Sequence, residues 1–180
     1  MNLLPIDELN RIEGKLKNAE ITGEKISQDE LLDDVLDFLL FAYFSGSQDA
    51  AESLGIVTEP SISKAQEAIN LKIAGKTYKD RITEYSESGT AEEILRVIDT
   101  DMTRIYNTGV LDTASANGAT MKTWQTMNDE KVRDTHSPLE GVTIPIDAEF
   151  YTWDSDHALQ PGRFEKPENN CNCRCILRVS

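Results

Sequence analysis

The 180-residue chain is predicted to have an α+β fold, with a mainly helical N-terminal part and a small β-rich C-terminal layer. In residues 1–117, apolar residues recur about one helical turn apart, as amphipathic helices require. In residues 118–180, short runs rich in β-branched and aromatic residues alternate with turn-forming residues. We therefore expect a helical region over residues 1–117 and a β-rich region over residues 118–180, with both regions sharing one core.

The first helix is predicted over residues 5–18, from apolar residues at helical spacing. Ser27 and Glu30 form a capping-box pattern that predicts the start of a second helix. A wide apolar stripe follows, from Leu31 to Tyr43. This stripe could dock a partner protein, but such stripes more often face a core, so we favour an internal helix of a bundle.

Gly46 and Gly55 interrupt this apolar pattern. A third helix is predicted over residues 62–74 and a fourth over residues 77–85, each after a loop-like segment. Thr90 is the predicted N-cap of the clearest long helix, which carries apolar residues about one turn apart.

This last helix of the N-terminal part also carries a polar face. Asp101 and Arg104 are spaced as an i,i+3 ion pair, and Asn107 follows three residues later. The three side chains could face the C-terminal part. The sequence alone favours a solvated helix face with a weak ion pair.

In the C-terminal part, residues 128–136 are predicted to form a short helix that stops before Pro138. Such a helix would pair Asp129 with Arg133 at i,i+4 spacing and place His136 on the same face.

Short strands are predicted beyond this helix. The segments 142–146 and 149–153 are rich in β-branched and aromatic residues, and the end of the chain, residues 171–179, is expected to form a final strand. Residues 154–157 and 160–163 have turn composition.

The cysteines raise the possibility of a metal site. In an extended segment alternate side chains share a face, so Cys171, Cys173 and Cys175 are expected to point the same way. With His136 or His157, they are candidate ligands of zinc, and the set that we single out is His136, Cys173 and Cys175. The C-x-C-x-C spacing differs from common zinc motifs, and a straight strand cannot easily surround a metal. Reduced cysteines packed in the core are therefore the simpler interpretation.

His136 could instead act as a general base oriented by Asp129 or Asp134. No established catalytic motif accompanies it, so a buried, hydrogen-bonded histidine is the simpler interpretation. Trp124 and Trp153 are most simply interpreted as core aromatics.

The composition of the chain limits the kinds of binding partner that we expect. The net charge of −14, from 32 acidic and 18 basic residues, opposes strong nucleic-acid binding. The longest apolar run, residues 38–44, is far shorter than the roughly 20 residues that span a bilayer, and the N-terminal residues lack a signal-peptide pattern. We expect folding in a cytosol, no membrane partner and no disulfide.

One ordered pattern carries a family resemblance. From Thr123 to Gly141 the chain reads T-W-x-T-x-x-D-x-x-V-R-x-x-H-x-x-L-x-G, and an N-C-R-C segment lies near its end. This pattern resembles the phage head morphogenesis family, the minor head proteins typified by the F protein of phage Mu. The matching residues are Trp124, Asp129, Val132, Arg133, His136, Leu139, Gly141, Phe150, Pro161, Gly162, Asn172, Cys173, Arg174 and Cys175. A weaker match comprises Asp101, where the family usually has Glu, with Arg104 and Asn107.

The resemblance implies a non-enzymatic structural protein of the virion that is assembled in the host cytoplasm. Its expected partners are the portal protein and other head proteins, and its expected roles are head assembly, packaging in the capsid and help in DNA delivery. The expected structural cluster comprises Trp124, Asp129, Arg133, His136, Gly141, Asn172 and Arg174. No catalytic residue and no obligatory cofactor are expected. Two alternatives stay open: a metal-dependent hydrolase or nuclease-like effector, and a zinc-stapled binding module without catalysis.

Overall fold

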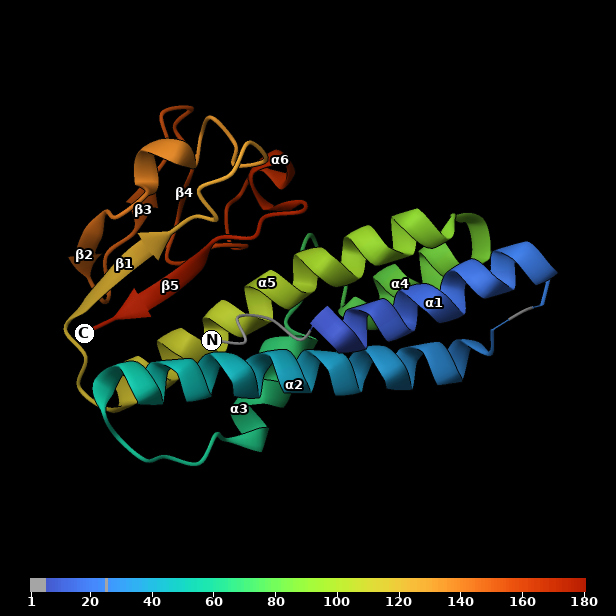
Figure 1. Ribbon diagram of the computed structural model, residues 1–180, viewed down its shortest axis with the longest axis horizontal. Helices are drawn as coiled ribbons and strands as arrows, with labels where there is room; N and C mark the ends of the chain where they lie inside the picture. The colour runs from blue at the N-terminus through green and yellow to red at the C-terminus, as the bar shows by residue number, and fades with distance from the viewer. Residues whose placement is uncertain (1–5, 25) are drawn as a thin grey trace.

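The computed structural model describes residues 6–24 and 26–180, and it has a helical body with a β-rich layer at one end (Figure 1). The helices of the body are α1 (Ile6–Thr22), α2 (Gln28–Leu54), α3 (Ile62–Asn70), α4 (Tyr78–Ser88) and α5 (Ala91–Ala116). The predicted α+β class is confirmed. Pro5, where the first helix was predicted to begin, lies outside the described residues.

Threonine capping boxes start two of these helices. The Thr90 hydroxyl accepts a hydrogen bond from the Glu93 N–H (3.3 Å), and the Glu93 carboxylate accepts one from the Thr90 N–H (2.8 Å). Thr77 begins α4 in the same way. At α2 the predicted position is right, but the predicted capping box is wrong because the Ser27 side chain makes no capping hydrogen bond.

Helices α2 and α5 cross at two glycines. A Cβ atom on Gly46 would overlap the carbonyl oxygen of Tyr106, and one on Gly109 would overlap the carbonyl oxygen of Tyr43. Gly46 therefore interrupts the apolar pattern without ending the helix, because α2 continues through it to Leu54 and uses the missing side chain for close backbone contact.

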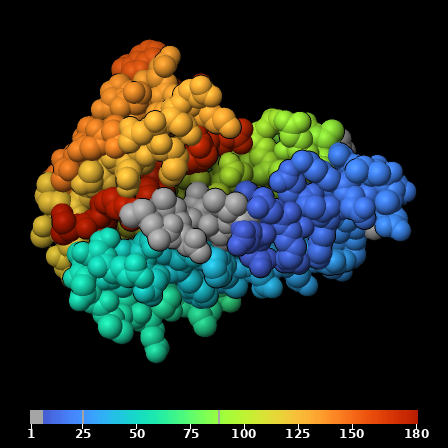
Figure 2. Space-filling model, viewed as in Figure 1, coloured from blue at the N-terminus to red at the C-terminus, as the bar shows by residue number. Residues whose placement is uncertain are grey.

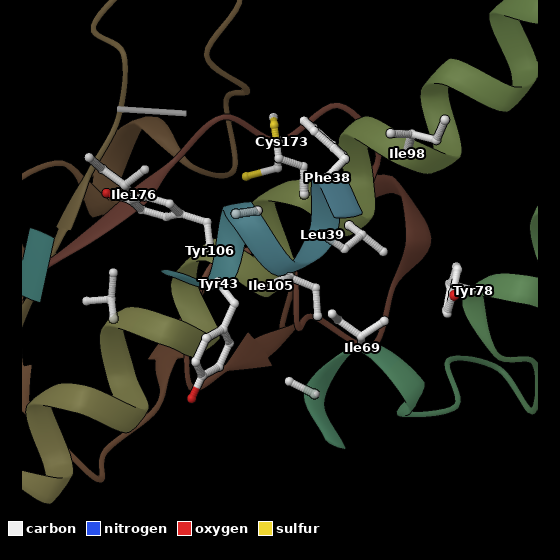
Figure 3. Close-up of a cluster of buried hydrophobic side chains, with 14 of the residues drawn as sticks. Phe38, Leu39, Tyr43, Ile69, Tyr78, Ile98, Ile105, Tyr106, Cys173 and Ile176 are labelled. Carbon is white, nitrogen blue, oxygen red and sulfur yellow. The ribbon is translucent and has the colours of Figure 1, made fainter. Parts of the chain in front are cut away.

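The apolar stripe of α2 is buried in the bundle, which confirms the internal-helix interpretation. It faces α5 over most of its length, and α1, α3 and α4 pack around this pair. Figure 3 shows Phe38, Leu39 and Tyr43 of α2 close to Ile105 and Tyr106 of α5.

The β-rich layer contains a three-stranded antiparallel sheet of order β2-β1-β5. Its strands are β1 (Met121–Gln125), β2 (Thr143–Pro145) and β5 (Ile176–Val179), and a hairpin joins β3 (Phe150–Tyr151) to β4 (His157–Ala158). Strand β1 was not predicted, although it is central. The predicted strands are shorter than expected, because the chain turns at residues 146–148 and 171–172.

The predicted helix over residues 128–136 is wrong. Asn128 has a left-handed backbone (φ 52°), and the Asp129 carboxylate accepts a hydrogen bond from the Lys131 N–H, which makes a local turn. A second turn leads into the 3-10 helix η1 (Ser137–Leu139). A helix this short is marginal in water, so local turns and contacts with the rest of the fold decide the conformation.

Buried side chains connect the two parts of the molecule. Strand β5 packs against α5, and one hydrophobic cluster includes Ile105 and Tyr106 of α5 together with Trp124 and Leu177 of the sheet. Figure 2 shows the C-terminal layer, yellow to red, against one end of the helical body, with α1 in blue at the other end. The division between residues 117 and 118 stays a prediction.

Candidate functional site

The polar face of α5 lies in the interior. Asp101, Arg104 and Asn107 are only 5%, 2% and 0% exposed, so the interpretation of a solvated face is wrong. The i,i+3 pair is confirmed, with 3.1 Å between Arg104 Nη2 and Asp101 Oδ1. Asp101 also pairs with Arg81 of α4, and Arg104 donates to the Ala68 carbonyl of α3. Burial lowers the pKa of Arg104, and the Asp101 carboxylate opposes that shift.

Asn107 fastens the C-terminal segment to this helix. Its Nδ2 donates to the Cys175 carbonyl (3.1 Å), and its Oδ1 accepts from the Leu177 N–H (2.8 Å). One turn earlier, the Thr103 hydroxyl donates to the Cys173 carbonyl. Thr103 was not predicted as a site residue, because a threonine in a helix gives no signal of a distant acceptor.

The N-C-R-C segment is bent rather than straight. Asn172 has a left-handed backbone (φ 54°), and the Arg133 guanidinium donates to the carbonyl of Cys171 on the other side of that bend. The predicted pairing of Asp129 with Arg133 is wrong. Asp129 instead pairs with Arg174 (2.7 Å), and this hydrogen bond lowers the pKa of the Asp129 carboxyl group.

The bend brings two of the three thiols to His136. The Nδ1 atom of His136 lies 3.7 Å from Cys173 Sγ and 3.6 Å from Cys175 Sγ, and all three ligand atoms lie within 4.8 Å of one another. Cys171 does not belong to this group, so the prediction that all three cysteines share one face is wrong. His157 lies elsewhere, beside Glu149 (3.1 Å).

Aromatic rings enclose the His136 imidazole. Trp124 meets it edge-on, with 5.4 Å between the ring centroids, and Phe164 stacks on it at 5.3 Å. Phe150 packs against Trp124 in turn, with 5.0 Å between the ring centroids. Trp124 is a core aromatic, as predicted, whereas Trp153 is 70% exposed and that prediction is wrong.

Neighbouring groups shift the pKa values of the two buried thiols. The Cys175 thiol and His136 stabilise the thiolate of Cys173 and lower its pKa well below the usual thiol value. The neighbouring Cys173 and burial both raise the pKa of Cys175. The pKa values of the two thiols are therefore shifted in opposite directions.

Two glycines allow neighbouring loops to pack closely against β1 and α5. Gly141 has φ 71°, and its N–H donates to the Trp124 carbonyl at the end of β1 (2.9 Å). Gly162 has φ 80°, and a Cβ atom there would press on the Arg104 backbone of α5. The Pro161-Gly162 turn thus lies directly on the buried polar helix face.

A comparison with protein families shows which family matches the chain. A family model described as "Phage Mu protein F like protein" matches residues 65–178, which is more than half of the chain. The chain belongs to the phage Mu F-like family. The match to the Mu F-like family runs from α3 to β5 and includes α5 and the whole C-terminal layer. No curated protein and no solved structure matches the chain.

Membership places this Mu F-like protein among the structural proteins of phage head morphogenesis, which belong to the virion and assemble in the host. None of the described helices is long and apolar enough to cross a membrane.

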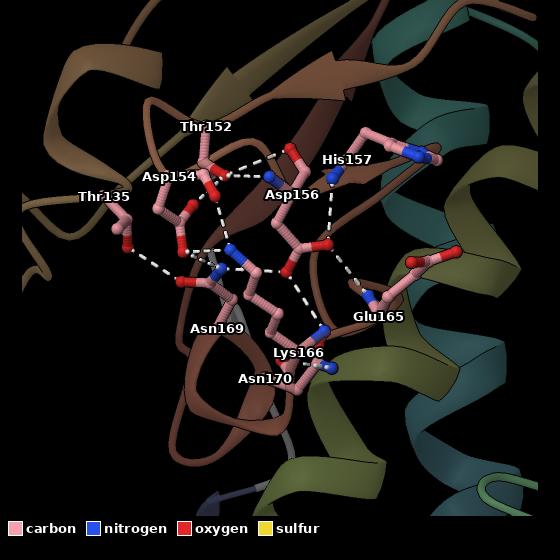
Figure 4. A network of polar contacts seen from close by, with 9 residues as sticks. All are labelled: Thr135, Thr152, Asp154, Asp156, His157, Glu165, Lys166, Asn169 and Asn170. Atoms are coloured by element: carbon pink, nitrogen blue, oxygen red, sulfur yellow. Dashed lines mark hydrogen bonds and ion pairs between the residues drawn. The ribbon is translucent and has the colours of Figure 1, made fainter.

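A polar loop completes the C-terminal layer of the Mu F-like fold (Figure 4). The buried Asp156 carboxylate accepts hydrogen bonds from the backbone N–H groups of His157, Glu165 and Lys166 and from the Asn169 amide (2.9–3.1 Å). The sequence indicates turns here, but it does not reveal that one carboxylate organises them. This loop holds Phe164 against the imidazole of His136.

The general-base hypothesis for His136 gains no support from its neighbours. Asp129 is bound to Arg174, and His136 has no carboxylate hydrogen-bond partner among residues 6–24 and 26–180. Its Nε2 is buried and has no hydrogen-bond partner in that same part of the chain. The imidazole of this Mu F-like protein is therefore oriented by sulfur atoms and aromatic rings.

Proposed function

We propose that this Mu F-like protein is a structural minor head protein that associates with the portal during head assembly, is packaged in the capsid and aids DNA delivery. Family membership supports this role. The observation that carries the proposal is that residues of the family motif make contacts within the fold. Asn107, Arg133 and Gly162 all contribute such contacts. A protein built this way serves as a rigid component of an assembly.

Charge is compatible with a place beside packaged DNA. A net charge of −14 opposes non-specific attraction to phosphates, so the protein would stay free to contact protein partners. Tight binding to duplex DNA at physiological salt would contradict this part of the proposal.

The portal association can be tested during head assembly. The chain is co-expressed with the other head proteins of its phage, with or without the portal protein, and the assembled shells are purified and probed for it. We expect retention in shells that contain the portal and loss from shells that lack it. Equal retention in both preparations would show that another head protein recruits it.

We also propose that the seven motif residues form a structural cluster that locks the β-rich layer to the helices. Its members are Trp124, Asp129, Arg133, His136, Gly141, Asn172 and Arg174. The hydrogen bond from Arg133 to the Cys171 carbonyl and the contacts of Trp124 support this proposal.

Two arginines, one inside this cluster and one outside it, allow a matched comparison. Arg133→Ala removes a donor from a partly buried carbonyl, so we expect the melting temperature to fall by several degrees. Arg96→Ala removes a solvent-exposed ion pair with Glu92 and serves as the control, for which we expect a change of about 1 kcal/mol or less. An unchanged melt of Arg133→Ala would count against the cluster.

A further inference from the structure

The cluster of His136, Cys173 and Cys175 has the dimensions of a metal site. A tetrahedral zinc ion with Zn–S of about 2.3 Å and Zn–N of about 2.0 Å holds its sulfur and nitrogen ligands roughly 3.5 Å apart. The two sulfur-to-nitrogen distances here are 3.7 and 3.6 Å. Both sulfur-to-nitrogen distances are therefore close to coordination spacing, and the two sulfur atoms lie within 4.8 Å of each other.

The backbone holds both thiols in place without help from the sulfur atoms. Thr103 fixes the carbonyl of Cys173, and Asn107 fixes the carbonyl of Cys175, both from the buried face of α5. The left-handed bend at Asn172 sets the direction of the segment. This bent backbone removes the objection that a straight C-x-C strand cannot surround a metal, because the third ligand comes from a separate turn.

Two arginines lie beside the cluster. His136, Cys173 and Cys175 are all buried, and Arg133 and Arg174 are among the residues that line a small hollow beside His136 and Cys175. Positive charge next to a thiol stabilises the thiolate, which is the form that binds metals. The buried Nε2 atom has no hydrogen-bond partner among the described residues, so the sulfur atoms form the polar side of this imidazole.

We propose that Cys173, Cys175 and His136 bind one zinc ion through the two Sγ atoms and Nδ1. Two thiolates and one neutral imidazole suit zinc, a borderline-soft ion that takes sulfur and nitrogen ligands. Binding releases the proton of each thiol that is protonated beforehand and leaves no net charge on the ion and its two thiolates. The ion joins the N-C-R-C segment to the turn that carries His136.

The space beside the cluster is small. The hollow that His136 and Cys175 line has a volume of about 10 Å³. A buried water needs about that much space, so the hollow can hold a water molecule but not a substrate. We therefore assign the ion a structural role, and zinc-dependent hydrolysis by the loaded chain would contradict that role.

The first test is metal content. The full chain is purified without chelators under reducing conditions, loaded with Zn²⁺, desalted and analysed for elements. We expect about one zinc per chain, and a melting temperature that falls by roughly 10 °C when a strong chelator removes it. Replacement by Co²⁺ should give the thiolate-to-cobalt absorption of a site with sulfur ligands.

Cysteine variants locate the ion. Cys173→Ser and Cys175→Ser should each lose the bound zinc, while Cys171→Ser, outside the cluster, should keep it. Because the first two variants can fail to fold, thiol alkylation of the wild-type chain gives a second measurement. Cys173 and Cys175 should react more slowly in the zinc-loaded chain than in the chelator-treated chain, while Cys171 should react at the same rate in both.

Two results would overturn the zinc proposal. One is a zinc-loaded chain that retains no metal and melts as it does with chelator. The other is mass-spectrometric evidence for a Cys173–Cys175 disulfide in the chain as purified. Neither result affects the portal association, which is measured on assembled heads.

Discussion

At the scale of single residues, the buried amide of Asn107 makes the most specific link between the two parts of the chain. Its side chain bonds to the Cys175 carbonyl and the Leu177 N–H, which lie about 70 positions away in the sequence. An amide suits this place because it offers a donor and an acceptor at once.

Asn107→Ala should therefore destabilise the fold. The change leaves a carbonyl and an N–H of the C-terminal segment without their partner in the interior, at a cost of about 2–4 kcal/mol. We expect the melting temperature to fall by roughly 5–15 °C in a thermal denaturation experiment.

Asn117→Ala provides the control in the same helix. Asn117 is exposed at the C-cap of α5, and within the described part of the chain its side chain donates only to the Thr113 carbonyl. We expect a change within about 1 kcal/mol. Equal losses for the two asparagines would mean that the link from Asn107 to the sheet adds nothing to stability.

At the scale of elements, the crossing of α2 and α5 depends on two glycines that face each other's backbone. Gly46→Ala or Gly109→Ala should push the two helices apart and cost roughly 3 kcal/mol or more, because the added methyl group meets backbone atoms that cannot move alone. Chemical denaturation measures this loss.

Gly14 in α1 provides the opposite case. It is exposed within the helix, and a Cβ atom there meets nothing within 4 Å. Gly14→Ala should stabilise the protein by about 0.5–1 kcal/mol, because alanine favours helices. A similar response of all three glycines to alanine would refute the close crossing.

The polar loop around Asp156 predicts a pH dependence. Burial alone would raise the pKa of Asp156, but hydrogen bonds from Asn169 and three backbone N–H groups lower it below the usual range. The Thr152 hydroxyl lowers the pKa of Asp154 to about 2. A carboxyl group with a lower pKa in the folded state adds stability above its unfolded pKa of about 4. That stability is lost as the pH falls through the folded value.

The melting temperature should accordingly drop between about pH 5 and pH 2. Asp156→Asn should lower it at neutral pH and flatten the acid dependence, while Glu165→Gln, an exposed neighbour, should do neither. A wild-type melting temperature that does not change over this range would exclude the carboxylate as the organiser of the loop.

At the scale of the whole molecule, sequence reasoning succeeds where the determinants are local. Thr90 predicts the start of α5 because the cap and its partner Glu93 lie three residues apart. The apolar stripe of α2 indicates its buried face for the same reason. The family resemblance rests on ordered motif residues, and the family match confirms it.

Sequence reasoning fails where distant contacts decide. Gly46 interrupts an apolar pattern because α5 lies against it, and Asp129 pairs with Arg174 rather than with the predicted Arg133. The approach of Cys173 and Cys175 to His136 depends on the bend at Asn172 and on two hydrogen bonds to α5. Such contacts leave no periodic signal in the sequence.

If the motif residues make the β-rich layer and the helices one structural unit, the two parts should unfold together. The two tryptophans permit a direct test, because Trp124 is buried in the layer and Trp153 is exposed. In a Trp153→Phe variant, fluorescence reports the surroundings of Trp124, while far-UV circular dichroism reports mainly the helices. We predict that the two thermal transitions coincide. Loss of the Trp124 signal well before the helices melt would show that the layer and the helices unfold separately.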